Sequence, residues 1–266
     1  MAPRLPVRVH GHRGARARLP ENTIPGFEYA IAQGVDALEL DLAVTKDDVV
    51  VVSHDPTLHP PICTGPEDNA IIRELTAAEL RQWDCGALPN PRFPMQKPVP
   101  GTRMPTLGEV FQLAGRGRFD YHLEIKSFPQ EPQFAPPPDE FARLVLEQIL
   151  CHRLAPRVAV LSFDFRVLAA MRELAPQIRL SALTEKDPRD FAAIARDAAG
   201  AEIVSLMLRL ITRDKVEAAH AAGLQIVAWT ANTPSEWDRL IQAGVDAIVT
   251  DDPAALIAYL KQNGLR

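Results

Sequence analysis

Short apolar segments alternate with amphipathic segments along most of this 266-residue chain. The apolar segments have the length of strands, and the segments between them carry apolar residues at helical spacing. Such alternation predicts a parallel sheet, because each helix returns the chain to the end at which the next strand begins. The expected strands are Val7–His10, Ala37–Val44, Val49–Ser53, Tyr121–Lys126, Val158–Ser162, Ile178–Leu183, Ile203–Ser205, Gln225–Trp229 and Ala247–Thr250. The expected helices are Pro25–Gln33, Thr106–Ala114, Asp139–His152, Phe165–Leu174, Arg189–Ala198, Asp214–Ala222, Ser235–Ala243 and Pro253–Gln262.

The number of strand–helix units indicates a closed barrel. About eight units in a chain of this length predict a single (β/α)8 barrel over residues 1–266 rather than an open sheet. An insertion rich in proline and glycine, residues 55–105, interrupts the alternation with one short helical piece near Ala77–Trp83, and a proline-rich loop covers Pro129–Pro138. Both follow strands, so both are expected at the carboxyl-terminal, catalytic face. Loop length alone leaves open whether they are lids or surface insertions.

Charge and cysteine content limit the partners and the location. The net charge is −5 and no basic patch stands out, so a nucleic-acid partner is not expected. Cys63, Cys85 and Cys151 are distant in sequence and form no CxxC motif, and such a sparse set is typical of the reducing cytoplasm. The segment MAPRLPVRVHG lacks the apolar core of a signal peptide, and no apolar run has the length of a membrane span. A cytoplasmic protein is expected, and a homo-oligomer is left open.

Three carboxylates are expected to meet in the barrel mouth. In ALELDLAV, side chains alternate between faces, so Glu39 and Asp41 share the face opposite the leucines. In YHLEIK, Glu124 and Lys126 share one face in the same way. Carboxylates this close repel each other; a divalent cation removes the repulsion, and oxygen ligands select Mg²⁺ or Ca²⁺. Lys126 adds a point charge for a phosphate oxygen. An internal ion-pair network is the alternative.

Two histidines stand at strand ends and favour acid–base chemistry. His12 comes at the end of the first strand, and His54 follows the apolar run VVVV. Two histidines beside an anion held by a cation can act as general base and general acid near neutral pH. Arg13 offers a forked contact for phosphate oxygens. His10 lies one layer deeper in the strand and is interpreted as core packing.

A series of short motifs runs in order from residue 12 to residue 253. The motifs are His12-Arg13-Gly14, Pro20-Glu21-Asn22-Thr23, Gly34-Val35-Asp36 with Glu39-x-Asp41, Thr45-Lys46-Asp47, His54-Asp55, Glu124-Ile-Lys126, Ser162-Phe163, Trp229-Thr230-x-Asn232, Gly244-Val245-Asp246 and Thr250-Asp251. Each is weak alone, but in this order they resemble the glycerophosphodiester phosphodiesterase family over essentially the whole barrel. The resemblance implies a TIM barrel that hydrolyses glycerophosphodiesters to sn-glycerol 3-phosphate and an alcohol with the help of a divalent cation.

The resemblance also implies residue roles, motif by motif. They are an acid–base pair of His12 and His54, metal ligands Glu39, Asp41 and Glu124, phosphate contacts Arg13 and Lys126, and Trp229 as a wall of the substrate pocket. Two positions depart from the family pattern. His59 and its neighbours replace an Arg-Thr-Thr-like segment, and His122 stands where asparagine is frequent. Both changes concern the recognition of the alcohol rather than the core chemistry.

Three other functions are weighed against this one. A lysophospholipase D or a sphingomyelinase D-like enzyme shares the plan of two histidines and three carboxylates; it needs an apolar docking surface, for which the insertion would be the place. A non-catalytic binding barrel would be expected to lose a histidine or an acid, and this chain has all five. An isomerase or aldolase-type barrel would need a Schiff-base lysine in apolar surroundings, whereas Lys126 lies beside Glu124.

Overall fold

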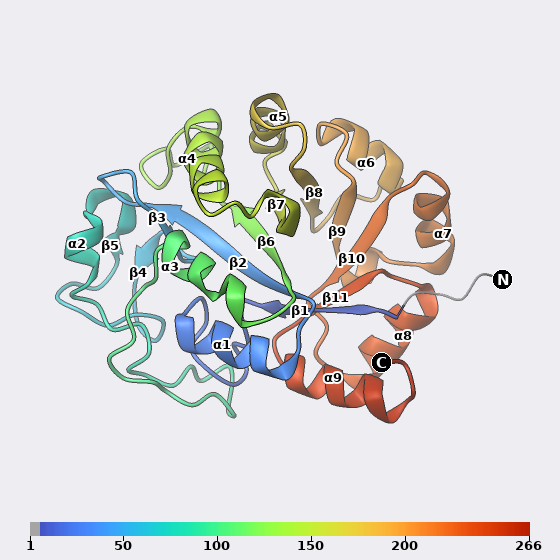
Figure 1. Cartoon of the computed structure of the whole chain (residues 1–266), viewed down its shortest axis with the longest axis horizontal. Helices are drawn as coiled ribbons and strands as arrows, with labels where there is room; N and C mark the ends of the chain where they lie inside the picture. Colours follow the sequence, from blue (N-terminus) through green and yellow to red (C-terminus); the bar gives the residue numbers. More distant parts are fainter. Residues whose placement is uncertain (1–5) are drawn as a thin grey trace.

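Eight parallel strands close into a barrel in the computed structural model, which describes residues 6–266. The barrel strands are β1 (Arg8–His12), β2 (Ala37–Val44), β6 (Asp120–Ile125), β7 (Val158–Ser162), β8 (Arg179–Thr184), β9 (Ile203–Met207), β10 (Gln225–Trp229) and β11 (Ala247–Thr250). Neighbours follow chain order, and β1 closes the ring by pairing with both β2 and β11 (Figure 1). The predicted (β/α)8 barrel is confirmed. Residues 1–5, the start of the segment in which no signal peptide is expected, lie outside the described residues.

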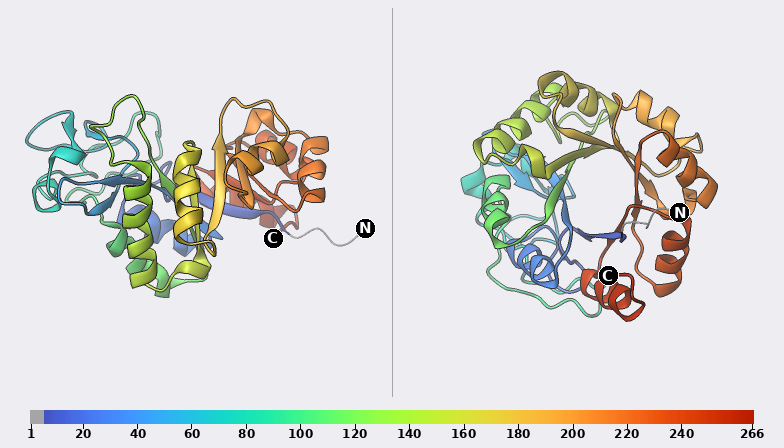
Figure 2. Two further views of the ribbon diagram at one scale, coloured as in Figure 1. Left: turned by 90° about the horizontal axis from the view of Figure 1, so that it is seen from above. Right: turned by 45° about the vertical axis from the view of Figure 1, so that its right-hand side comes forward.

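Helices surround the ring of strands, as Figure 2 shows in its right-hand view. They are α1 (Ile24–Gln33), α3 (Leu107–Phe111), α4 (Pro138–Cys151), α5 (Phe165–Leu174), α6 (Phe191–Asp197), α7 (Arg213–Ala221), α8 (Pro234–Ala243) and α9 (Pro253–Gln262). Local sequence fixes their ends. Helix α1 begins where the Thr23 side chain accepts a hydrogen bond from the Gly26 amide, and it ends at Gly34, whose φ of 87° suits glycine.

Side-chain alternation in β2 separates the core from the site. Leu40 and its two leucine neighbours are fully buried in the main core between barrel and helices. The carboxylates of the same strand point the other way, into the barrel. Strand register then aligns them with neighbouring strands: Glu39 lies opposite His12 of β1, and Asp41 lies opposite Glu124 of β6. The alternation seen in the sequence therefore places its polar residues correctly.

Some element boundaries differ from the predicted ones. Strand β1 continues to His12 rather than ending at His10, because Gly11 and His12 still pair with the neighbouring strands. The helix expected over Thr106–Ala114 is split into α3 and a 3-10 helix over Gln112–Arg116. The second strand expected beside β2 is confirmed as β3 (Val50–Val52), which pairs antiparallel to the end of β2.

The insertion builds a small second core together with Ala43 of β2 and Val51 of β3. It contains a hairpin of β4 (Thr57–Leu58) and β5 (Ala70–Ile71), a 3-10 helix over Ile72–Glu74, and α2 (Ala77–Leu80). Trp83 is buried at its centre, and the indole nitrogen donates to the Glu67 carbonyl at 3.2 Å. The insertion therefore has packing that a tolerated surface loop would not need.

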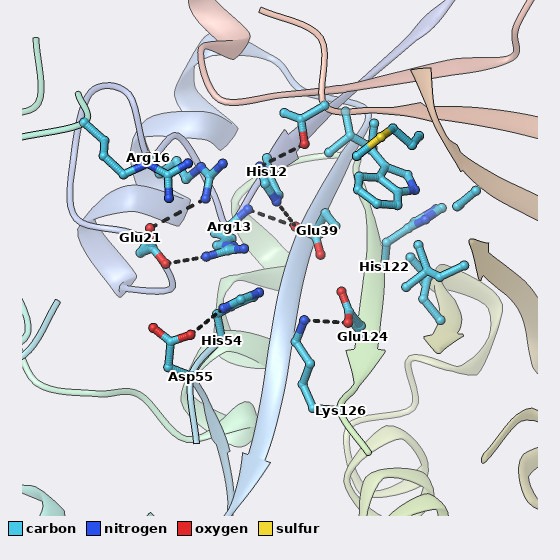
Figure 3. A pocket seen from close by; sticks show the side chains of 18 of the residues that line it. His12, Arg13, Arg16, Glu21, Glu39, His54, Asp55, His122, Glu124 and Lys126 are labelled. Atoms are coloured by element: carbon cyan, nitrogen blue, oxygen red, sulfur yellow. Dashed lines mark hydrogen bonds and ion pairs between the residues drawn. The ribbon is translucent and has the colours of Figure 1, made fainter. Parts of the chain in front are cut away.

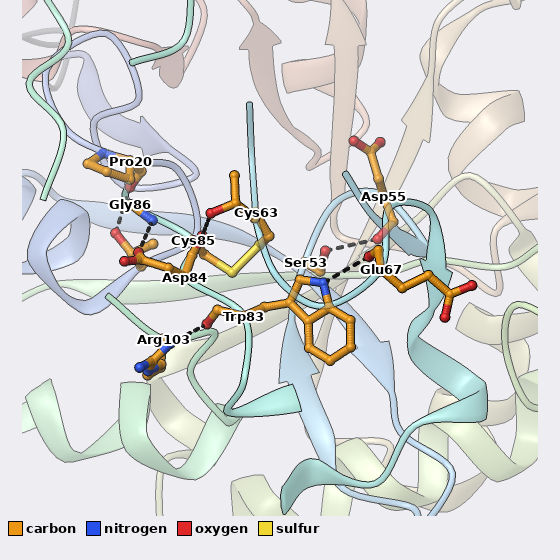
Figure 4. The surroundings of a disulfide bond; sticks show 12 residues. Pro20, Ser53, Asp55, Cys63, Glu67, Trp83, Asp84, Cys85, Gly86 and Arg103 are labelled. Carbon is orange, nitrogen blue, oxygen red and sulfur yellow. Dashed lines mark hydrogen bonds between the residues drawn. A yellow bond between two sulfur atoms is a disulfide. The ribbon is translucent and has the colours of Figure 1, made fainter. Parts of the chain in front are cut away.

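Cys63 and Cys85 form a disulfide within this small core, next to Trp83 (Figure 4). The sulfur atoms are 2.04 Å apart, and the bridge spans 22 residues. The sparse cysteines are typical of a reducing compartment, and their spacing predicted no pairing; the structure joins two of the three. Sequence spacing missed it because the hairpin and α2, not a short motif, bring the two cysteines together.

Within residues 6–266, none of the helices combines the length and the apolar character that crossing a membrane requires.

Candidate active site

A cavity of about 800 Å³ opens at the carboxyl-terminal ends of the barrel strands (Figure 3). Residues from β1, β2 and β6 line its polar side. Leu161, Leu183 and Val227 line an apolar side built by later strands. His59 and Phe93 of the insertion also line the cavity, so the insertion forms part of the wall.

The three predicted carboxylates meet inside this cavity. Glu39, Asp41 and Glu124 are all buried, and one oxygen of each lies within 4.8 Å of the others. Burial, followed by repulsion from the other two acids, raises the pKa of Glu39. Burial also raises the pKa of Glu124. Closely spaced buried oxygen donors are the set that a hard divalent cation binds, so these residues fit the expected metal site.

Two cations contact the carboxylates. Lys126 Nζ lies 2.5 Å from Glu124 Oε1 and 3.0 Å from Asp41 Oδ1. Arg13 Nε lies 3.2 Å from Asp41 Oδ2, while the Arg13 backbone amide donates to Glu39 Oε2 at 3.0 Å. Burial alone would raise the pKa of Asp41, but Lys126 and Arg13 hold it well below its usual range. Glu39 makes no ion pair with a lysine or arginine side chain among the described residues. The ion-pair network given as the alternative is therefore incomplete at Glu39.

The turn between β1 and α1 holds these groups in place. Glu21 Oε1 accepts a hydrogen bond from Arg13 Nη1 at 2.7 Å, and Asn22 Nδ2 donates to Asp41 Oδ2 at 2.9 Å. Gly14 has a φ of 88°, and an added Cβ would lie 2.9 Å from the Gly26 backbone of α1. The turn thus orients one cation and one carboxylate at once.

His12 is fixed by an aspartate that sequence reasoning did not assign. Its Nδ1 lies 2.6 Å from Oδ1 of Asp251. Asp251 is the first residue after β11 (Ala247–Thr250). Asp251 also accepts hydrogen bonds from Arg16 Nε at 2.6 Å and from Asn232 Nδ2 at 2.7 Å. Burial, which outweighs the bond to Asp251, lowers the pKa of His12 to about 4. The available signal was the position of Asp251 at a strand end, but only barrel closure brings that end beside β1.

His54 is held by its own neighbour in sequence. Its Nδ1 lies 2.8 Å from Asp55 Oδ1, and the hydrogen bond from His54 lowers the pKa of Asp55 to about 2. The His54 side chain is 35% exposed, against 13% for His12. Figure 3 shows the two histidines on either side of Arg13. Each has its Nδ1 on an aspartate, which leaves Nε2 for chemistry.

The other residues singled out in the sequence lie beneath the cavity or line its wall. His10 is 1% exposed and its ring lies 4.3 Å from that of His122, which confirms its place in the core. His122 lines the cavity, and burial lowers its pKa to about 3. Trp229 also lines the cavity and packs edge-on against Phe163, with ring centroids 5.8 Å apart. All eight predicted site residues therefore lie around this cavity or directly against its carboxylates.

Comparison with known sequences agrees with this geometry. The glycerophosphoryl diester phosphodiesterase family profile matches residues 12–255. A glycerophosphodiester phosphodiesterase of Caldanaerobacter subterraneus subsp. tengcongensis is 30% identical over 260 residues, which cover 96% of this chain and 98% of the relative.

Solved structures with a similar fold include two phosphodiesterases. A Silicibacter pomeroyi structure assigned as a glycerophosphoryl diester phosphodiesterase has a TM-score of 0.90 and 33% identity, with 98% of this chain and 95% of that chain covered. An Oleispira antarctica phosphodiesterase, solved with the product sn-glycerol 3-phosphate, has a TM-score of 0.82 and 22% identity, with 96% and 97% covered. The motifs, the barrel and these comparisons together show that the chain belongs to the glycerophosphoryl diester phosphodiesterase family.

Proposed function

We propose that this protein hydrolyses glycerophosphodiesters to sn-glycerol 3-phosphate and an alcohol, with the help of a divalent cation, Mg²⁺ or Ca²⁺. The observation that carries the proposal is one cavity in which two histidine–aspartate pairs accompany three buried carboxylates. The product bound to the Oleispira antarctica protein supports the same class of product here.

Arg13 and Lys126 are proposed to bind the phosphate oxygens. Carboxylates already hold both cations in fixed positions, so little reorganisation is needed when negative charge builds up on the phosphate. Glu39, Asp41 and Glu124 would hold the divalent cation. When bound, that cation neutralises the carboxylates and withdraws charge from the phosphodiester.

The surroundings of the two histidines support one direction for proton transfer. An ionised carboxylate only accepts hydrogen bonds, so Asp251 fixes the Nδ1–H form of His12 and leaves its Nε2 lone pair available. We assign His12 as the base that removes a proton from the nucleophile. The nucleophile is either water, which gives sn-glycerol 3-phosphate directly, or the neighbouring glycerol hydroxyl, which gives a cyclic phosphate that water then hydrolyses. His54, which is more exposed and can recover a proton from solvent, donates to the leaving alkoxide as the phosphorus–oxygen bond breaks.

Trp229 and Phe163 are proposed to contact the organic part of the substrate. Their rings pack edge-on against each other and form an aromatic corner of the cavity. Replacing Trp229 with alanine should therefore raise KM more than it lowers kcat.

A coupled assay for sn-glycerol 3-phosphate tests the function. We expect release from glycerophosphocholine that EDTA abolishes and that Mg²⁺ or Ca²⁺ restores. Full activity in excess EDTA would contradict the metal site. Cleavage of lysophosphatidylcholine without cleavage of glycerophosphocholine would favour the lysophospholipase D alternative instead.

A cytoplasmic location stays a prediction, and the Cys63–Cys85 bridge weighs against it because disulfides are rare in a reducing compartment. The oligomeric state also stays open.

A further inference from the structure

The aspartate that holds His54 has a second histidine on its other oxygen. Asp55 Oδ1 lies 2.8 Å from His54 Nδ1, and Asp55 Oδ2 lies 3.0 Å from His59 Nε2. The other ring nitrogen of His59, Nδ1, lies 3.0 Å from the Pro60 carbonyl oxygen. His59 belongs to the insertion and lines the cavity. One carboxylate therefore bridges a residue at the barrel edge and a residue of the insertion.

The partners of His59 decide its protonation. A backbone carbonyl can only accept a hydrogen bond, and so can an ionised carboxylate. Both ring nitrogens of His59 must therefore donate, which requires the imidazolium form. The electrostatic surroundings act in the same direction: the hydrogen bond from His54 lowers the pKa of Asp55 to about 2, and the bond to the Pro60 carbonyl, followed by Asp55, raises the pKa of His59. Glu21 is the other acid whose charge acts on His59 in the same direction.

We propose that His59 is a positioning residue for the hydrolysis: as an imidazolium it fixes the Asp55 carboxylate, and Asp55 in turn fixes the ring of His54. The inference rests on the proposed function only for the role of His54. Asp55 needs such a second contact because its side chain is 36% exposed, so water competes for its oxygens and its rotamer is otherwise weakly restrained.

The chain offers a matched control. His220 Nε2 lies 2.9 Å from Asp246 Oδ2, and both side chains are 35% exposed. The corresponding exposures for His59 and Asp55 are 32% and 36%. Neither His220 nor Asp246 lines the cavity. The two pairs thus match in the distance between histidine and aspartate and in exposure, and they differ in location.

The first experiment reads the protonation of His59 directly, without any assay of activity. Nitrogen-15 NMR of the histidine rings, assigned by the loss of one signal set in His59→Phe, should show both nitrogens of His59 protonated at pH 7.5, where an ordinary histidine with a pKa of about 6.5 is neutral. In Asp55→Asn the His59 signals should move to the neutral form at that pH. A neutral His59 in the unmodified protein would overturn the proposal, whatever the enzyme hydrolyses.

The second experiment separates positioning from other roles. His59→Phe should lower kcat at least about tenfold, part of the ~10²–10⁴ that a general acid contributes, and should leave KM for glycerophosphocholine nearly unchanged. His59→Gln, whose amide can still donate to Asp55, should recover most of that loss. His220→Phe should leave kcat unchanged. If the glutamine variant recovered none of the lost kcat, the loss would not come from the missing hydrogen bond to Asp55, and the positioning role would be overturned.

A double-mutant cycle completes the test. Because His59 acts only through Asp55, adding His59→Phe to Asp55→Asn should lower kcat no further. Additive losses would contradict the proposal. If the unmodified protein does not cleave glycerophosphodiesters at all, the NMR result still decides whether the His54–Asp55–His59 arrangement exists.

Discussion

The two histidine–aspartate pairs of the cavity share their geometry but not their structural support. His12 lies in strand β1 and Asp251 directly after β11, 239 residues apart in sequence, and both are nearly buried. Arg16 also holds Asp251. His54 and Asp55 are adjacent in sequence, are about one-third exposed, and depend on the insertion for further contacts. The same type of hydrogen bond therefore occurs once between buried residues of the barrel and once between partly exposed residues at the start of the insertion.

This contrast teaches that equal roles in chemistry need not mean equal roles in stability. The barrel pair, His12 and Asp251, lies inside a network of buried charges. Removing either residue leaves other charges without partners. The edge pair, His54 and Asp55, is partly solvated, so water can replace a lost contact. The predictions below ask where this distinction fails.

The largest effect should be the loss of activity when either histidine is removed, because both are proposed to transfer protons. His12→Ala and His54→Ala should each lower kcat by about 10²–10⁴, because each removes one acid–base group. Steady-state assays with glycerophosphocholine measure this, and circular dichroism checks that each variant keeps its fold. Near-normal turnover in either variant would remove that histidine from the mechanism.

Stability should separate the pairs. Asp251→Ala should lower the free energy of unfolding by about 3–5 kcal/mol, because the buried Arg16 loses its 2.6 Å partner. Asp55→Ala should cost about 1 kcal/mol or less, as is typical of exposed ion pairs. Denaturant unfolding in EDTA measures both. Equal losses would mean that the edge pair is as much a part of the framework as the barrel pair.

The disulfide should act on the edge pair alone. The double substitution Cys63→Ser and Cys85→Ser should cost about 3 kcal/mol, the entropic value for a loop of this size. The ring NMR signals of His54 should change in this variant while those of His12 stay the same. Cys151→Ser, which removes an exposed thiol, is the control. A change at His12 would show that the small core supports the barrel as well.

The two edges of the cavity should also differ in pH dependence. The pKa of His12 is lowered from 6.5 to about 4, so the unfolded chain binds this proton more tightly, and stability should fall as pH drops from about 6.5 to 4. His59 has a raised pKa, so its contribution is complete below 6.5 and is lost as pH rises above that value. In thermal unfolding measured in EDTA, the stability of His12→Gln should depend less on pH on the acid side, and that of His59→Gln should depend less on pH on the alkaline side. A reversed pattern would contradict the assigned environments.

Local rules predicted the barrel and most of the site from sequence. Alternation in β2 placed Glu39 and Asp41, and the strand ends placed His12 and His54, because these depend only on side-chain direction and strand position. Asp251 and the Cys63–Cys85 bridge were missed for a common reason. Each depends on a contact between segments that no local pattern joins, namely the closure of the barrel and the packing of the insertion.

The pairing of β1 with β11 also has a consequence for protein synthesis. A ribosome makes Asp251 239 residues after His12, and the hydrogen bond between them cannot form until β11 has emerged. A growing chain could thus fold much of the barrel around its carboxylates while its buried histidine still lacked its aspartate. Under the mechanism proposed here, hydrolytic activity would begin only after β11 and Asp251 have been made and have closed the barrel beside β1.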